Sequence, residues 1–337
     1  MSEMKFRTLG LSDLNVSILS LGCLHFGVYL TEIESINMVH HALENGINLI
    51  DTGPLYGNGL SESIVGKAIR GHRDKVFLTT KMGLARRKLA DGSFGVEVVP
   101  LSKERIRDSL EKSLKEIGTD YIDIFQFHAY DNYTPLEESF ETMDRLVAEG
   151  KIRSIAVSNY DHNEMESVLS IIRKNSWQPL VAIETHYNVI ERMVEKELLP
   201  ICEKNQVSVI PYRALARGIL TGKYGAEGTI PSNSRAKDSW RVRQWLSPET
   251  LAVVSSLETY AIQNGRTVSE LAIAWLFAKT NIGSVLIGAR DIGQLQTCLD
   301  SCSWSLDSEH LLEIDRLIDL HGQTNHVATH PEVYFEK

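Results

Sequence analysis

The stretch IESINMVHHALENGINLIDTGPLYGNGLSESIVGKAIR, residues 33–70, contains the pattern that decides the fold. Apolar residues recur at helical spacing over 33–43, and 47–50 is a short apolar run typical of a buried strand. A second helix is predicted over 61–70. The unit to look for along the chain is therefore a short apolar run followed by an amphipathic segment.

The same unit recurs along the chain. Strands are predicted at 18–22, 47–50, 76–80, 121–127, 152–157, 180–183, 207–211 and 285–287. Helices are predicted at 33–43, 61–70, 102–117, 136–148, 163–173, 191–204, 248–279, 292–299 and 308–320. Such alternation indicates parallel strands joined by right-handed crossovers. Eight units favour an α/β fold of the closed (β/α)8 TIM-barrel type over an open doubly wound sheet.

Local signals refine this organisation. Ser102 is a plausible helix N-cap and Gly118 a helix stop. The helical region 248–279 is expected to break at Gly265, with Thr267 capping its second piece. Residues 5–16 are expected to form a hairpin around Gly10, and 213–247 an irregular stretch. No linker or composition shift is present, so we expect one domain over 1–337; the tail 321–337 is either a loop over the site or a frayed end.

Composition excludes several classes of function. The chain has 337 residues, 43% of them hydrophobic, and a formal net charge of −9, which argues against nucleic-acid binding. No apolar signal segment or membrane-length stretch is found. The four cysteines lack CxxC spacing, so neither a disulfide framework nor a metal site is expected. These features indicate a cytoplasmic protein without a membrane partner.

Polar residues follow most of the predicted strands. In a barrel of this type the carboxyl ends of the strands form the active site. The residues at or just after these ends are Asp51, Tyr56, Lys81, His128, Ser158, Asn159, Glu184 and Tyr212. Each alone has an ordinary alternative as a turn, solvated or structural residue. Together, four titratable groups on three successive strand ends indicate a site.

The four titratable groups have a joint chemical logic. A tyrosine hydroxyl with a pKa near 10 is a poor acid at neutral pH, and an ammonium such as that of Lys81 is expected to lower the pKa of Tyr56. Asp51 would hold the lysine, and His128 would hydrogen-bond a substrate carbonyl. No GxSxG, HExxH or Walker A motif supplies a nucleophile, metal or phosphate site. A proton donor without a nucleophile suits hydride transfer from a cofactor.

Over nearly its whole length the sequence resembles the aldo-keto reductase superfamily. The motifs that carry this resemblance, in chain order, are 46–52 with Tyr56-Gly57 and Ser61-Glu62, 79–81, 120–123 with Gln126 and His128, 150–153, 157–159, Tyr187-Asn188 with Arg192, and 217–224. The resemblance implies an oxidoreductase with the catalytic tetrad Asp51, Tyr56, Lys81 and His128. Cofactor contacts implied by it or by the basic run near strands seven and eight are Gly22, Cys23, Asp51, Ser158, Asn159, Glu184, Tyr212, Arg213, Leu215, Arg217, Gly218, Leu220, Lys223, Arg235, Gly288, Arg290 and Gln294.

Two departures from the family pattern concern the cofactor. Glu184 stands where the family usually has a glutamine that contacts the nicotinamide carboxamide, and a carboxylate can only accept hydrogen bonds. Asp291 stands where Ser, Thr or Arg often holds the ribose 2′-phosphate, which its charge would repel unless Arg290 compensates. The resemblance therefore implies NADPH, with NADH as the alternative.

Substrate and partners are less constrained. The pocket candidates mix aromatic and polar side chains and comprise His25, Phe26, Leu55, Tyr56, Met82, His128, Tyr130 and Trp240. They permit a hydroxylated or sugar-derived carbonyl or alcohol as a small-molecule substrate. The alternative is a cofactor-binding regulatory subunit that resembles the potassium-channel β-subunits. Both a monomer and a homo-oligomer are compatible with the sequence.

Overall fold

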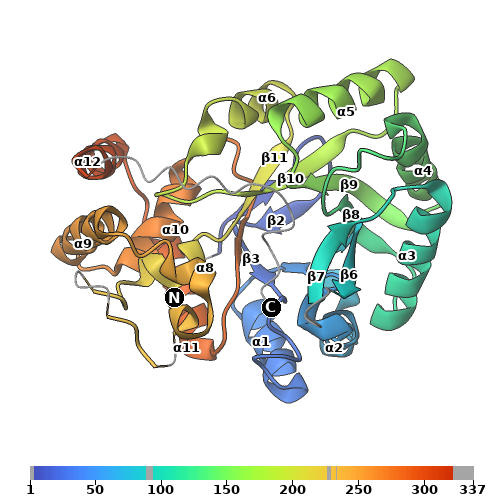
Figure 1. Cartoon of the computed structure of the whole chain (residues 1–337). Coiled ribbons are helices and arrows are strands. Elements are labelled where there is room, and N and C mark those ends of the chain that lie inside the picture. The colour runs from blue at the N-terminus through green and yellow to red at the C-terminus, as the bar shows by residue number, and fades with distance from the viewer. Residues whose placement is uncertain (1–3, 89–93, 226–228, 233, 322–337) are drawn as a thin grey trace.

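Eight parallel strands form the central sheet of the computed structural model, which describes residues 4–88, 94–225, 229–232 and 234–321 (Figure 1). In spatial order they are β11 (Ser208–Tyr212), β10 (Leu180–His186), β9 (Ile152–Ser158), β8 (Ile122–Phe127), β5 (Phe77–Met82), β4 (Leu49–Asp51), β3 (Leu19–Gly22) and β12 (Val285–Ile287). A parallel bridge between Val209 and Ile282, next to the start of β12, brings the two edges together. The predicted (β/α)8 barrel is confirmed.

The strands form because their residues are buried on both faces. Every residue of β8 and of β10 is buried, which explains the apolar residues that made these strands predictable, and two of their polar residues, Gln126 and Glu184, hydrogen-bond each other. All the neighbours pair in parallel, so their carboxyl ends lie at one end of the barrel. The polar residues at those ends are thereby collected in one place.

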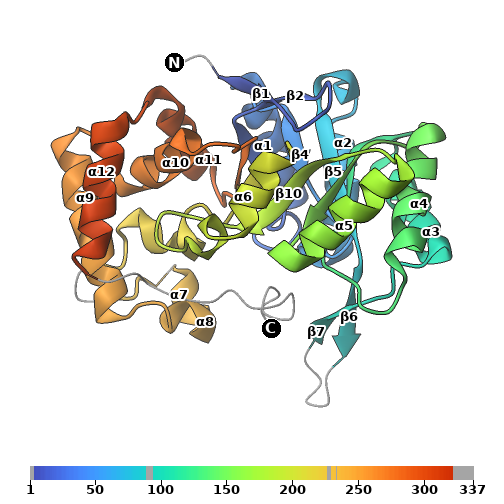
Figure 2. The same ribbon diagram turned by 90° about the horizontal axis from the view of Figure 1, so that it is seen from above.

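Helices surround the strands (Figures 1 and 2). The longer ones are α1 (Glu32–Glu44), α2 (Ser61–Ala68), α3 (Lys103–Ile117), α4 (Leu136–Ala148), α5 (His162–Asn175), α6 (Leu198–Lys204), α9 (Pro248–Gln263), α10 (Val268–Ala278), α11 (Ile292–Asp300) and α12 (Ser308–Asp319). The predicted N-caps are confirmed, since Ser102 and Thr267 each accept a hydrogen bond from the third residue of their helix. Gly118 ends α3 in the left-handed conformation, at φ 75°.

Hairpins lie at the two ends of the barrel (Figure 2). The predicted one pairs β1 (Phe6–Thr8) with β2 (Asn15–Ser17). The backbone N–H of Gly10 donates to Ser208 Oγ at 2.9 Å and a Cβ there would lie 2.5 Å from the oxygen of Val181, so only glycine fits. A second hairpin, β6 (Leu84–Lys88) with β7 (Phe94–Val98), lies at the opposite end and was not predicted from the sequence.

Two sequence predictions need correction. The helix expected at 191–204 is limited to α6, preceded by the short η3 (Met193–Glu195). The reason is a turn in which Asn188 Oδ1 accepts from the N–H groups of Ile190 and Glu191, both at 3.1 Å. The stretch 213–247 is not wholly irregular, because it contains η4 (Ala216–Thr221), α7 (Arg235–Asp238) and α8 (Trp240–Arg243).

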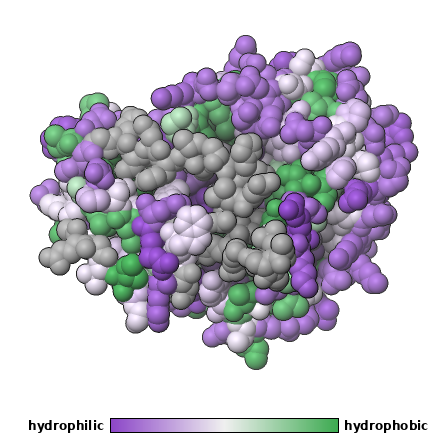
Figure 3. Space-filling model, viewed as in Figure 1, coloured by the Kyte–Doolittle hydropathy of each residue, from purple (hydrophilic) through white to green (hydrophobic). Residues whose placement is uncertain are grey.

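The outer surface is mainly hydrophilic on the face seen in Figure 3, where apolar residues form only separate patches. This fits the helix sequences, since α3 presents Lys, Arg and Glu outward and buries Ile106, Leu110 and Leu114. No helix in the described part of the chain is both long and apolar enough to cross a membrane. The described residues also contain no group of three or more His, Cys, Asp or Glu side chains placed to hold a metal.

Candidate active site

A cleft of about 580 Å³ opens at the carboxyl ends of the strands. It collects residues from β3 to α11, which are far apart in the sequence. The sequence-predicted site residues that line it are Gly22, His25, Asp51, Tyr56, His128, Asn159, Glu184, Tyr212, Arg213, Leu215, Arg217, Gly218, Lys223, Gly288, Arg290 and Gln294. The polar residues around Tyr56 and the basic residues that follow β11 thus line the same cleft.

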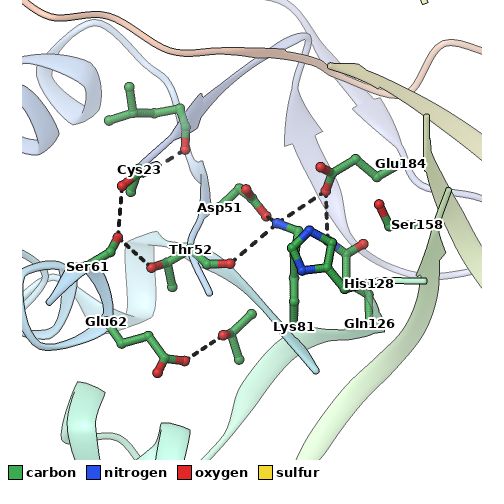
Figure 4. Close-up of polar contacts among 12 residues, drawn as sticks. Cys23, Asp51, Thr52, Ser61, Glu62, Lys81, Gln126, His128, Ser158 and Glu184 are labelled. Atoms are coloured by element: carbon green, nitrogen blue, oxygen red, sulfur yellow. Dashed lines mark hydrogen bonds and ion pairs between the residues drawn. The ribbon is translucent and has the colours of Figure 1, made fainter. Parts of the chain in front are cut away.

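Lys81 is completely buried and contacts two of the residues that line this cleft, Asp51 and Glu184 (Figure 4). Its Nζ donates to Asp51 Oδ1, lies 3.3 Å from Glu184 Oε2 and donates to the backbone oxygen of Thr52 at 3.4 Å. Gln126 Nε2 donates to the same Glu184 oxygen at 2.7 Å. A buried ammonium needs compensating charge, and here two carboxylates supply it.

Tyr56 is positioned by a tight turn after β4. It begins η1 (Tyr56–Gly59), in which Gly57 has φ 58° and a Cβ at Gly57 would lie 1.8 Å from the backbone oxygen of Phe26. Lys81 Nζ lies 4.9 Å from the centre of the Tyr56 ring, and the His128 ring lies 6.0 Å away at an angle of 75°. The predicted tetrad is therefore one cluster.

The electrostatics of Tyr56 combine two opposing effects. Burial raises the pKa of its hydroxyl, and the ammonium of Lys81 lowers that pKa, as the sequence predicts, but by less than burial raises it. Burial, followed by Lys81, holds the pKa of His128 well below its ordinary value, so its imidazole is neutral at neutral pH. Burial raises the pKa of Asp51 to about 8; Lys81 opposes this and Glu184 adds to it.

A polar and aromatic network continues from the tetrad along the cleft. Tyr212 Oη donates to Asn159 Oδ1 at 2.6 Å, and Asn159 Nδ2 donates to the backbone oxygen of His128 at 2.9 Å. Behind Tyr212, the ring of His186 is stacked at 5.6 Å, and Trp245 stacks on His186 at 5.9 Å. These contacts fix the plane of Tyr212, which gives the cleft a flat aromatic wall.

The loop after β11 has the chemistry of an anion site. Arg213, Ala216, Arg217 and Gly218 all have positive φ, between 46° and 94°. This backbone makes the loop tight, and within it the N–H groups of Ala216 and Gly218 donate to the backbone oxygens of Arg213 and Leu215 at 2.7 Å and 2.8 Å. A Cβ at Gly218 would lie 2.7 Å from Lys223 Nζ, so glycine lets this cation approach the backbone. Two arginines and a lysine beside such a loop fit the pyrophosphate of a dinucleotide.

The far end of the cleft lies at the start of α11. Asp291 caps this helix, with Oδ1 accepting from the backbone N–H of Gln294 at 2.8 Å and Oδ2 accepting from Gln294 Nε2 at 2.8 Å. Gln294 Oε1 in turn accepts from the backbone N–H of Arg290 at 3.0 Å. The Arg290 guanidinium lies 3.9 Å above the ring of Tyr29. The helix N-terminus, a favourable place for a phosphate, therefore already holds a carboxylate.

Some predicted site residues do not line the cleft. Lys81, Cys23, Phe26, Met82, Ser158 and Leu220 are buried, Leu55 and Tyr130 are half-buried, and Trp240 is 60% exposed on α8. The side chain of Arg235 lies outside the described part of the structure. Sequence analysis missed the lining residues Leu24, Ala214, Thr221, Thr267, Ser269, Leu286 and Ile287. Of these residues only Thr267 had a signal in the sequence: as a predicted N-cap it marks the start of a helix, and that start lies at the cleft.

Comparisons with known proteins agree with this geometry. The model of the aldo/keto reductase family matches residues 18–319. The chain is 36% identical over 291 residues to the aldo-keto reductase YhdN of Bacillus subtilis, covering 86% of this chain and 84% of that protein. It is 30% identical to the L-glyceraldehyde 3-phosphate reductase of Escherichia coli, over 94% of this chain and 93% of that one. The solved structure of a glycerol dehydrogenase from Gluconobacter oxydans superposes with a TM-score of 0.83 at 32% identity, covering 98% and 99% of the two chains.

The barrel and these matches define an oxidoreductase. The chain belongs to the aldo/keto reductase family, as the sequence motifs implied.

Proposed function

We propose that this chain interconverts an aldehyde or ketone and the corresponding alcohol by nicotinamide-dependent hydride transfer, with Tyr56 as the proton donor. The observation that carries the proposal is the buried contact of Lys81 with Asp51, next to Tyr56 and His128 in the cleft that also contains the anion-binding loop. A bound nicotinamide would supply or accept the hydride.

Each of the chain's own groups has a distinct task in the proposed reaction. Tyr56 Oη gives its proton to the carbonyl oxygen as the alcohol forms. The ammonium of Lys81 stabilises the phenolate that remains, and Asp51 holds that ammonium in place. The neutral imidazole of His128 donates a hydrogen bond to the substrate oxygen and orients it. Burial of the cluster excludes water, which strengthens these interactions.

The direct test is Tyr56→Phe. We expect kcat with a panel of aldehydes and ketones to fall by about 10²–10⁴-fold, the usual contribution of a general acid, while the Kd of the cofactor changes little. Unchanged turnover in the variant would show that another group supplies the proton. Absence of turnover by the unmodified protein with every carbonyl tested would instead favour the regulatory alternative, for which the comparisons offer no support.

For the dinucleotide we propose NADPH, with NADH as the alternative that Asp291 favours. One relative, from Escherichia coli, is named as an NADH-specific methylglyoxal reductase and is 32% identical over 305 residues. Asp291→Ser keeps an N-cap residue but removes the charge. We expect it to raise the affinity for NADPH relative to NADH by about tenfold, measured as a ratio of Kd values. An unchanged ratio would mean that Asp291 does not face the 2′-phosphate.

The substrate class follows from the polar lining of the cleft and from the names of relatives that act on triose phosphate and glycerol. We propose a small hydroxylated aldehyde or ketone, or its alcohol. The cysteines at 23, 202, 298 and 302 are free thiols, which supports the proposal of a reducing, cytoplasmic location. We also propose that residues 1–337 form one domain, as monomer or homo-oligomer.

A further inference from the structure

The ammonium of Lys81 is shared between two acids rather than paired with one. Its partners are Asp51 on β4 and Glu184 on β10, and the three side chains, here called the carboxylate–lysine trio, are all buried (Figure 4). With both acids ionised the trio carries a net charge of −1. An amide at position 184, the usual residue of the family, would make this charge zero.

Glu184 also lines the cleft in which, under the proposed function, the nicotinamide must lie near Tyr56 to exchange a hydride with the substrate. It lines the cleft together with Asn159 at the end of β9 and Tyr212 at the end of β11, and these strands flank β10 on its two sides. The oxidised nicotinamide ring carries a positive charge and the reduced ring does not. A carboxylate at this wall therefore distinguishes the two redox forms, and weak screening in a buried site makes the difference large.

We infer that Glu184 biases the cofactor site toward binding the oxidised, cationic nicotinamide, more strongly than the same site with glutamine would. The inference rests on the proposed function, because it requires nicotinamide binding in this cleft. It assigns Glu184 the role of a specificity-determining residue for the redox state of the bound cofactor.

The preference for the oxidised nicotinamide is expected to depend on pH, because Asp51 in the trio gains or loses a proton. Burial, with help from Glu184, raises the pKa of Asp51 to about 8, so the trio becomes net negative as the pH rises through the neutral range. The other titratable groups around it are His128 after β8, Tyr56 after β4 and Cys23 after β3. Burial keeps His128 neutral and raises the pKa values of the Tyr56 hydroxyl and the Cys23 thiol, so these three contribute little change.

The test measures binding rather than turnover. Dissociation constants for the oxidised and reduced forms of NAD and NADP are measured by calorimetry from about pH 6 to about pH 9. Tyr56→Phe serves as the parent, because it prevents turnover and removes the phenolate. The ratio of reduced-form to oxidised-form Kd cancels effects on the phosphates and the adenosine. We expect Glu184→Gln in this parent to lower the ratio by about tenfold at the highest pH.

A matched control is available in Glu62→Gln. Glu62 is also a buried acid, but it accepts from Thr80 Oγ1 at 2.6 Å and does not line the cleft. We expect the Kd ratio of this variant to stay unchanged. The pH series of the Tyr56→Phe parent is a second test, which needs no change at Glu184. We expect its ratio of reduced-form to oxidised-form Kd to rise with pH.

The outcomes separate this inference from the proposed function. Binding of both redox forms with a ratio that Glu184→Gln does not alter would overturn the inference and leave the proposed function intact. A ratio in the parent that stays flat with pH would overturn it as well, even if the Glu184 variant failed to fold. Failure of every nicotinamide dinucleotide to bind the unmodified protein would refute the proposed function itself.

Discussion

Replacing Lys81 with methionine is expected to destabilise the protein strongly and in a pH-dependent way. Lys81 has no exposed surface, and its two acid partners, Asp51 and Glu184, are only 3% and 5% exposed. Methionine fills a similar volume but leaves both acids buried without a cation. Removing one partner of a buried ion pair costs about 3–5 kcal/mol, and we expect a loss of this size at about pH 8.

The sign of the pH dependence follows from proton binding. Lys81 is the largest influence that lowers the pKa of Asp51, so its removal raises that pKa above about 8. A carboxyl group whose pKa is raised in the folded state stabilises fully below its unfolded pKa, and this stability is lost as the pH rises through the folded value. In the unmodified protein Asp51 keeps its proton below about pH 8, so the folded variant holds one proton more only above that pH, and there the loss grows by about 1.4 kcal/mol per pH unit.

The assay is urea unfolding at several pH values, with the free energy of unfolding extrapolated to water. Lys67→Met is the control, because the ion pair of Lys67 with Glu32 at 2.7 Å is about half exposed on both sides. Its loss should stay below about 1 kcal/mol at every pH. A loss below about 1 kcal/mol for Lys81→Met at about pH 8, or a loss that does not grow from about pH 8 to about pH 9, would refute the reasoning.

Three further predictions concern the turn, the imidazole and a helix cap. Gly57→Ala, whose Cβ would overlap the Phe26 oxygen at 1.8 Å, is expected to lower kcat by about 100-fold through displacement of Tyr56; unchanged kcat would show that the turn adapts. Because the pKa of His128 is held well below its ordinary value, kcat for carbonyl reduction should not fall as the pH drops through about 6.5, and a titration near that pH in the rate profile would contradict its neutrality. Thr267→Ala should lower the free energy of unfolding by about 1 kcal/mol, since Thr267 and Glu270 form a capping box at α10; calorimetric unfolding that shows no loss would mean that water replaces the cap.

Much of the fold could be predicted because its signals are local. A strand buried on both faces, such as β8, is mostly apolar, and its polar residues Asp123 and Gln126 are hydrogen-bonded. A helix cap such as Ser102 or Thr267 acts within one turn. The β6–β7 hairpin has no such signal. Its residues are partly or fully exposed apart from Leu84. Arg86 of the hairpin donates to Asn58 Oδ1 in η1, a contact between distant segments that forms only in the folded chain.

The residues of the site that could be predicted are those at the carboxyl ends of the strands, because these ends converge. Asp51, Tyr56, Lys81 and His128 follow successive strands, so topology alone brings them near one another. The contact between Lys81 and Glu184 is different, because β8 and β9 lie between their strands and the side chains meet only across the barrel interior. The net direction of the Tyr56 pKa also depends on how deeply the ring is buried, which no sequence pattern measures.

Tyr56, the proposed proton donor, lies on a turn that side-chain hydrogen bonds hold in place. Thr52 Oγ1 and Ser61 Oγ are hydrogen-bonded at 2.8 Å, and Ser61 Oγ donates to the backbone oxygen of Cys23 at 2.9 Å, so the turn that carries Tyr56 is tied at both ends (Figure 4). In the described part of the chain, neither the β6–β7 hairpin nor the α7–α8 segment contributes a residue to the lining of the cleft. Substitutions in these two segments can therefore accumulate while the turn that carries Tyr56 is kept.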